Sequence, residues 1–405
     1  MSKSARKWLS RFLKLAVCAG ALWYLSDKVT WNDRVRLRSN PDETLRLIAV
    51  TGDVLRVADE SGREREVLRS ELATTDQLGK GERDIELGLK SIVRGADWNW
   101  GFWAILTLGP TAFIMAWRLQ ILLATQEIHL SYRDCLLLTF AGNFFNFAMP
   151  GTTGGDIYKA YHIAKRTHRR TEGITIVLLD RAVGLISFLI LAAATILASW
   201  RSSMIGGYGQ AVGYLLVAFI VGGCLFFSRR FRRLIRYDTL LTKLPLADKI
   251  RRIDETTFSF RYHHAQAAFA LATTIVSHFC IVTSVYCTAH ALGIHPTGGQ
   301  TEAMLYWTCL LSAVVGYLFA SVPITFQGFG LLEAVFYKVM VEGGWCTASQ
   351  MLALTLSMRL IQILWSLPGV LVPWLGFRRP PEAELTAVAE GQGVEARFGA
   401  DTTGN

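Results

Sequence analysis

Several ionisable residues of this chain lie inside apolar stretches, and these are its candidates for chemistry. Asp180 and Arg181 lie in the first third of an apolar stretch over 174–200, while Lys159 and Glu333 each follow a Gly/Pro-rich interruption of another apolar stretch. A charge at the centre of a bilayer costs at least about 2.5–3.5 kcal/mol, so each is a candidate for function. Lys159 and Arg181 could donate charge-assisted hydrogen bonds to a lipid phosphate. Glu333 could bind a cationic group or form an internal ion pair.

The two interruptions share a pattern. Residues 143–160 read NFFNFAMPGTTGGDIYKA, and residues 320–334 read ASVPITFQGFGLLEA. Each has a proline, then a threonine, then paired or near-paired glycines, then a charged residue just before alanine. A helix that breaks inside hydrocarbon leaves backbone groups unpaired, so protein or trapped water must line the break. Two such segments in matching halves indicate a transport site near the bilayer midplane, around one hydrophilic chamber. Two surface turns between ordinary spans are the alternative.

The candidate substrate-binding residues come from these segments and from the charged pair. Asn143 and Asn146 share a helix face and could line a polar cavity. Helix N termini after the two prolines would present free N–H groups and positive dipole ends to a phosphate. Asp180 is the expected partner of Arg181, although the pair could instead fix helix register. The full set is Asn143, Asn146, Pro150, Gly154, Gly155, Asp156, Lys159, Asp180, Arg181, Pro323, Thr325, Gly328, Gly330 and Glu333.

Composition indicates an integral membrane protein. The 405 residues are 51% hydrophobic and only 18% charged, with a mean hydropathy of +0.31, which is outside the range of soluble domains. The net charge of +10 comes from basic clusters that flank apolar stretches, and no nucleic-acid motif accompanies them. The seven cysteines lie in or beside apolar stretches and are expected to be free thiols. The histidines lack metal-ligand spacing, so neither a metal nor a cofactor is predicted.

The chain is therefore predicted to be an all-α polytopic membrane protein with inverted re-entrant helices and a small β-rich insert. Residues 1–26 are expected to form a first transmembrane segment, 27–97 an extracytoplasmic β-rich insert, 98–376 the main transmembrane domain, and 377–405 a disordered cytoplasmic tail. In the insert, alternation over 45–50 and 54–57 and a turn at 60–62 predict strands and a hairpin.

Length separates spans from re-entrant arms, because a helix needs about 20 apolar residues to cross. The stretch 134–149 is too short, so with 155–164 it predicts a re-entrant hairpin. The stretch 304–322 could cross, but we favour a second hairpin turning at 323–330, since this leaves Arg378 and Arg379 in the cytoplasm. Arg118 and Arg359 are expected to snorkel towards the interface. Spans are predicted over 9–25, 98–123, 174–200, 208–227, 265–292 and 348–375, with an interface helix within 228–264.

With these residues in view, the chain resembles the lysylphosphatidylglycerol synthase transmembrane-region family, which is described as flippase-like. The matching pieces are Trp117-Arg118-Leu119, the 143–160 segment, Asp180-Arg181 and the 323–334 segment, and the resemblance covers roughly 98–376. The 27–97 insert departs from the pattern. Nothing after Arg379 could fold into the aminoacyl-transferase domain that gives the family its name. The resemblance therefore implies the membrane translocation part and puts synthase activity in doubt.

We expect a protein of the cytoplasmic membrane that binds and translocates a phospholipid or lipid-linked headgroup, with an anionic membrane lipid as its partner. One alternative is a membrane transferase acting on a lipid phosphate or lipid-linked sugar, although no catalytic constellation is visible in the loops. An enzymatic role is therefore the less expected one. The other alternative is a non-transporting scaffold whose insert recruits a partner. The sequence leaves the lipid, the direction of movement and the oligomeric state open.

Overall fold

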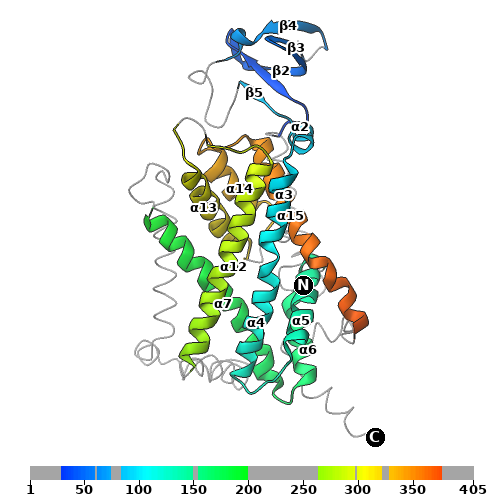
Figure 1. Cartoon of the computed structure of the whole chain (residues 1–405), viewed down its shortest axis with the longest axis vertical. Helices are drawn as coiled ribbons and strands as arrows, with labels where there is room; N and C mark the ends of the chain where they lie inside the picture. Colours follow the sequence, from blue (N-terminus) through cyan, green and yellow to red (C-terminus); the bar gives the residue numbers. More distant parts are fainter. Residues whose placement is uncertain are drawn as a thin grey trace, which may run out of the picture. The chain divides into compact units, whose positions relative to one another are not determined.

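The chain forms a small antiparallel sheet and a series of apolar helices, whose labels are given in Figure 1. It divides into two compact units, one made of residues 1–108 and 281–361 and the other of residues 109–280 and 362–405. The computed structural model describes residues 29–59, 62–73, 84–148, 154–198, 263–296, 299–321 and 328–375.

The first unit begins with a five-stranded antiparallel sheet in the order β4-β3-β2-β1-β5. Apolar residues on one face of this sheet, including Val35, Leu45 and Val57, form a buried cluster. They alternate with exposed polar residues, as in an antiparallel sheet with one solvated face. The strands confirm those predicted over 45–50 and 54–57. Their bounds are β1 (Arg34–Leu37), β2 (Asn40–Thr51), β3 (Val54–Ala58), β4 (Glu64–Leu68) and β5 (Ile85–Glu86), with a 3₁₀ turn at Arg69–Glu71.

A short segment, residues 87–97, leads from the sheet to the first long helix, and we call it the neck. Asp33, just before β1, accepts hydrogen bonds from the Gly88 N–H at 2.8 Å and from the Ser91 hydroxyl at 2.9 Å. Ser91 belongs to the six-residue helix α2 (Leu89–Arg94). A Cβ at Gly88 would overlap the backbone of Asn32, so only glycine allows this approach. Asp33 therefore ties the start of the sheet to its end.

The remaining elements are helical. The first unit holds α3 (Trp98–Leu108), α13 (Glu302–Ala320) and α14 (Leu331–Phe336), which continues as a π-helical turn (Tyr337–Val341). The second holds α4 (Pro110–Ala124), α5 (Tyr132–Ala148), α6 (Gly154–Arg166), α7 (Arg170–Ala198) and a 3₁₀ stretch (Leu367–Leu375). Helices α12 (His264–Ala291) and α15 (Ala348–Ser366) contribute residues to both units.

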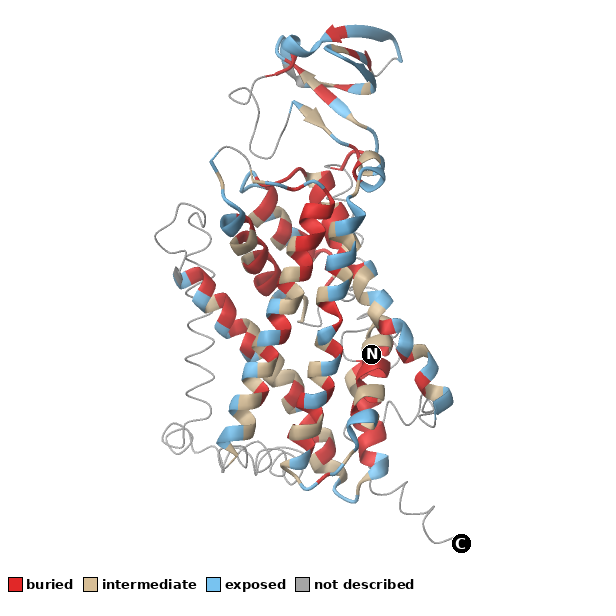
Figure 2. Cartoon of the chain, viewed as in Figure 1, coloured by how far each residue is buried: buried red, intermediate tan, exposed pale blue. Residues whose placement is uncertain are grey.

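Within the described residues, five helical stretches are long and apolar enough to cross a membrane. Large apolar side chains are exposed along them, for example Leu178, Ile186 and Ile190 of α7, and Figure 2 shows exposed residues between buried and half-buried ones along α7 and α12. Such faces suit contact with lipid tails. The stretches are Trp98–Ala124, Arg170–Leu197, His264–Ala291, Glu302–Ala320 and Ala348–Leu375.

Four of these stretches coincide with predicted spans and confirm that each is a long apolar helix. The fifth, Glu302–Ala320, is the segment that we favoured as a re-entrant arm. Its length also allows crossing, and the re-entrant arm stays a prediction. The predicted helices over 9–25 and 208–227, the interface helix within 228–264 and the tail lie outside the described residues, apart from His263 and His264 where α12 begins.

The first span contains an interruption that its sequence pattern does not predict. Helix α3 ends at Leu108 and α4 begins at Pro110, with Gly109 between them. Proline lacks an N–H and is favoured at the first position of a helix, so it restarts the hydrogen-bond pattern. Gly109 keeps helical dihedral angles (φ −51°, ψ −49°), and a Cβ there would overlap the Trp365 ring.

Candidate functional site

Helices α5 and α6 pack closely against each other in the second unit, and Gly155 makes this possible. A Cβ on Gly155 would overlap the carbonyl group of Gly142, so the two backbones approach through glycines. The Gly155 N–H donates to Asn146 Oδ1 at 2.8 Å, which satisfies one of the N–H groups left open at a helix start. The predicted helix pair is thus confirmed, with α6 beginning at Gly154. Its re-entry from one side of a membrane stays a prediction.

Lys159 is the unusual residue of this helix pair. Its side chain lies over Gly142 and is so close that a Cβ on Gly142 would collide with Lys159 Cε. The residue is only 8% exposed. Among the described residues, no hydrogen bond or ion pair reaches its ammonium group. Buried charges in proteins are normally paired, so this lysine is a candidate for binding an anion.

The pairing of Asp180 and Arg181 differs from the prediction. Arg181 of α7 forms an ion pair with Asp156 in the first turn of α6. Asp180 accepts a hydrogen bond from Arg118 Nε at 2.7 Å instead. Consecutive residues of an α-helix point about 100° apart, so neighbours in sequence reach different partners. The expected Asp180–Arg181 pair is therefore wrong.

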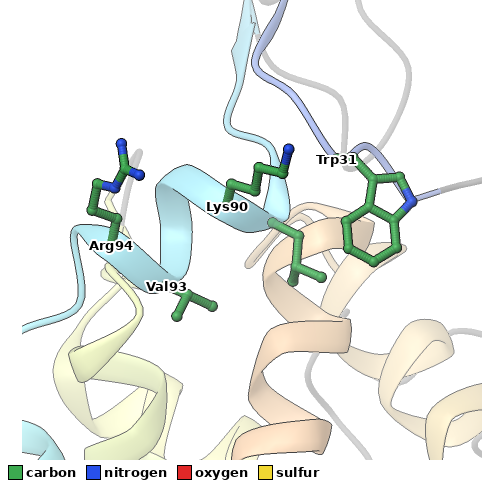
Figure 3. Close-up of a pocket in the computed structure, with 5 residues that line it drawn as sticks. Trp31, Lys90, Val93 and Arg94 are labelled. Carbon is green, nitrogen blue, oxygen red and sulfur yellow. The ribbon is translucent and has the colours of Figure 1, made fainter.

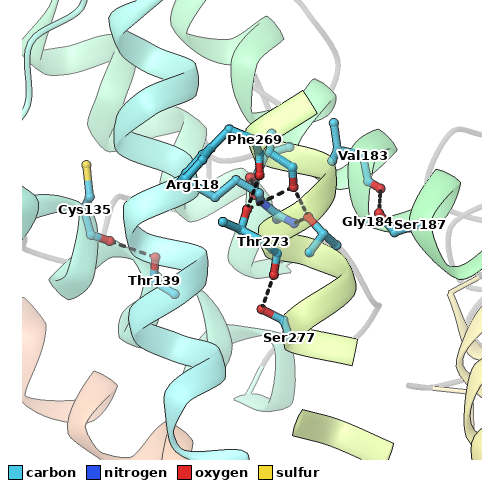
Figure 4. Close-up of polar contacts among 12 residues, drawn as sticks. Arg118, Cys135, Thr139, Val183, Gly184, Ser187, Phe269, Thr273 and Ser277 are labelled. Atoms are coloured by element: carbon cyan, nitrogen blue, oxygen red, sulfur yellow. Dashed lines mark hydrogen bonds and ion pairs between the residues drawn. The ribbon is translucent and has the colours of Figure 1, made fainter. Parts of the chain in front are cut away.

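Arg118 is buried rather than snorkelling, which corrects a second prediction. Besides Asp180, it donates from Nη1 to Thr274 Oγ1 of α12 at 2.6 Å. Figure 4 shows Arg118 against α12, where the hydroxyls of Thr273 and Ser277 donate to carbonyl oxygens of their own helix. The buried ion pair thus joins α4, α7 and α12 within the second unit. Opposite charges in separate spans were the signal that could have revealed this pair, because an intramembrane charge needs a partner.

Glu333 forms an internal ion pair, one of the two roles that the sequence left open. In the first unit, its Oε1 accepts from Arg359 Nη2 at 2.9 Å and from Nε at 3.2 Å. Its Oε2 accepts from the Gly330 N–H at 2.7 Å, at the start of α14. The Arg359 guanidinium lies 3.7 Å from the centroid of the Phe329 ring. Arg359 is therefore buried and paired, and the expectation that it snorkels is wrong.

Glycine is required at two positions before α14. Gly328 and Gly330 have φ angles of +72° and +85°, in the left-handed region that side chains rarely adopt. A Cβ on Gly328 would also overlap Ala320. These glycines let the chain turn at 328–330, directly before α14, so that the Gly330 N–H meets the Glu333 carboxylate.

The predicted set thus separates into two groups. Gly328, Gly330 and Glu333 lie in the first unit, and the residues from Asn143 to Arg181 lie in the second. Asn143 is half-buried and has no hydrogen bond to a described residue. Pro150, Pro323 and Thr325 lie outside the described residues, so their roles stay predictions. The five cysteines in the described ranges are free thiols, and those ranges hold no group of three His, Cys, Asp or Glu side chains suited to a metal.

Apolar helices that bury ion pairs and a lone lysine define a multi-pass membrane protein. The model of the lysylphosphatidylglycerol synthase transmembrane region matches residues 88–369, and the chain belongs to this family. This confirms the resemblance drawn from the sequence. The match begins at the neck, just after the last strand of the sheet. Comparisons with curated proteins and with solved structures gave no match.

Proposed function

We propose that this protein binds a phospholipid or lipid-linked headgroup at the α5–α6 helix pair and translocates it across the cytoplasmic membrane. Lys159 is the observation that carries the proposal, because a buried cation without a protein partner in the described chain needs an anion. Membership of a family named for a lipid synthase supports a lipid as the source of that anion.

The balance of buried charge indicates the charge of the ligand. Arg118 with Asp180, and Arg181 with Asp156, form pairs with no net charge. Lys159 adds one positive charge to these two neutral pairs. A phosphodiester carries one negative charge at neutral pH, so an anionic phospholipid or lipid-linked phosphodiester would balance the site.

The residues around Lys159 suit a phosphodiester headgroup. Lys159 follows the start of α6 by little more than one turn, so the positive end of the helix dipole adds to its field. Asn143 is half-buried with no partner among the described residues, and we assign it to a polar group of the headgroup. Arg181 is about a quarter exposed, and we assign it to a second phosphate contact. Glu333 and Arg359 position helices in this proposal.

We also propose an orientation. The β-rich insert, residues 27–97, lies outside the cytoplasmic membrane, and residues 377–405 form a tail in the cytoplasm. The basic residues at the end of α6 and the start of α7, including Lys165 and Arg170, support this arrangement through the positive-inside rule. Labelling of single cysteines by an impermeant maleimide in intact spheroplasts tests it, with the exposed Ser70 as the site: Ser70→Cys is expected to react from outside. Labelling of Ser70→Cys only after lysis would reverse the orientation.

The transport proposal is tested with fluorescent phosphatidylglycerol in proteoliposomes. Dithionite bleaches the label in the outer leaflet, so the bleached fraction beyond one leaflet reports movement. We expect wild-type protein to move the lipid and Lys159→Met to fall to the rate of protein-free vesicles. Lys165→Met, on the exposed side of the same helix, is the matched control. Equal rates for wild type and Lys159→Met would refute the proposal, and a new covalent lipid product would favour a transferase instead.

A further inference from the structure

A shallow pocket of about 500 Å³ lies at the neck between the sheet and α3, inside the first unit. We call the residues around it the neck patch: Trp31, Leu89, Lys90, Val93 and Arg94. Figure 3 shows Lys90 and Arg94 on one side of α2 and Val93 on the other, with Trp31 beside them. The two cations share a side because residues four apart lie on the same helix face.

The neck patch combines exposed apolar side chains with unpaired cations. Trp31 is 63% exposed and Val93 is 54% exposed, whereas Ile92 is buried and holds α2 in place. Lys90 and Arg94 are exposed and form no ion pair with any described residue. An exposed tryptophan next to unpaired cations suits contact with a surface that has an apolar interior under a negatively charged outer layer.

The position of α2 in the sequence identifies that surface. Arg94 precedes Trp98, the first residue of a membrane-spanning stretch, by four residues. Four residues extend at most about 15 Å, so the neck patch cannot lie far from the end of the span. Trp98 and Trp103 are 78% and 49% exposed, and exposed tryptophans mark the level of lipid headgroups. The patch therefore lies within reach of the membrane surface.

We propose that the neck patch binds the headgroups of anionic phospholipids in the leaflet where the Trp98–Ala124 span begins. Trp31 and Val93 enter the boundary between headgroups and acyl chains, and Lys90 and Arg94 contact phosphate groups. This contact fixes the neck, and with it the sheet, at the membrane surface. The neck patch lies in the first unit and takes no part in the binding of lipid at Lys159, so the inference does not depend on lipid transport.

The test uses full-length protein in nanodiscs and the fluorescence of Trp31. The difference between wild type and Trp31→Phe isolates the signal of this residue, which brominated lipids quench on contact. We expect brominated phosphatidylglycerol to quench it more strongly than brominated phosphatidylcholine at equal mole fraction. Each basic residue near an anionic surface changes affinity by about 5-fold, so Lys90→Ala/Arg94→Ala should reduce the preference for phosphatidylglycerol by up to about 25-fold.

The control removes the same charge from the exposed arginines of the sheet. Arg38→Ala/Arg65→Ala should leave the quenching unchanged, because Arg38 follows the end of β1 opposite to Asp33 and Arg65 lies on β4, two strands removed from β1. Unquenched Trp31 in wild type would overturn the proposal and direct the search to an acidic protein partner. Equal quenching by the two brominated lipids would also overturn it. The comparison of the two brominated lipids uses only wild type and Trp31→Phe. It therefore decides the question even if Lys90→Ala/Arg94→Ala misfolds.

Discussion

Substitution of Lys159 by methionine separates a binding role from a structural one. Methionine keeps an unbranched side chain of similar length and removes the charge. In the lipid-free protein, the unpaired ammonium group costs about 2.5–3.5 kcal/mol if it lies at membrane depth. Because Lys159 is only 8% exposed, we expect Lys159→Met to raise the free energy of unfolding by roughly 2–3 kcal/mol.

The same substitution should weaken lipid binding. A hydrogen bond to a charged group contributes about 1.5–3 kcal/mol, which corresponds to about a 10- to 150-fold change in Kd. The two effects have opposite signs: the variant is more stable alone and binds phosphatidylglycerol less well. If Lys159 only held helices together, its replacement would lower the stability of the protein and leave the binding of phosphatidylglycerol unchanged.

Thermal unfolding in detergent measures both effects. Protein is first freed of lipid by detergent exchange and unfolded alone, then unfolded with increasing phosphatidylglycerol. At a lipid concentration of about 100 times its Kd, wild type gains about 2.7 kcal/mol of stability, whereas a variant with about 100-fold weaker binding gains only about 0.4 kcal/mol. Lys165→Met, exposed on the same helix, should match wild type in both measurements.

A binding role for Lys159 is refuted if Lys159→Met unfolds at a lower temperature than wild type without lipid and still gains the full stabilisation with lipid. That outcome would make Lys159 a structural residue whose partner is part of the protein.

Three further predictions concern the framework. Gly155→Ala should lower the free energy of unfolding by about 1–3 kcal/mol, because the added Cβ overlaps α5. Gly184→Ala is the control: its Cβ would enter open space, so it should raise the free energy of unfolding by up to about 1 kcal/mol. Thermal unfolding measures both changes. Glu333→Gln leaves a buried Arg359 without its counter-charge and should cost about 3–5 kcal/mol, and a double-mutant cycle with Arg359→Met should show non-additive effects if the pair is coupled. Replacement of residues 34–86 by a short Gly-Ser linker should leave phosphatidylglycerol movement in proteoliposomes intact, whereas a scaffold would lose its partner.

The placement of helices and strands followed from the sequence. Apolar stretches of sufficient length predicted the spans at 98–123 and 174–200, because hydrocarbon requires a continuous apolar helix. Period-two alternation predicted the strands of the insert, because one face of the sheet is buried. The interruption at Gly109 was not predicted, because a glycine and a proline within a long apolar stretch leave its length and hydropathy unchanged.

The pairing of charges needed the tertiary structure. Sequence proximity suggested that Asp180 pairs with Arg181, but rotation along α7 directs them to Arg118 and Asp156 on other helices. Arg118 and Asp180 are 62 positions apart, and which helix faces meet depends on packing across the whole unit.

The sequence by itself determined that this chain crosses a membrane, that its helices are interrupted at two glycine-rich segments, and which charged residues lie among apolar ones. Only the tertiary structure decided which of those charges neutralise each other within the described chain and that Lys159 has no such partner there. The physical reason is that hydropathy and backbone breaks are local properties of a segment, whereas the neutrality of a buried charge depends on every side chain that surrounds it.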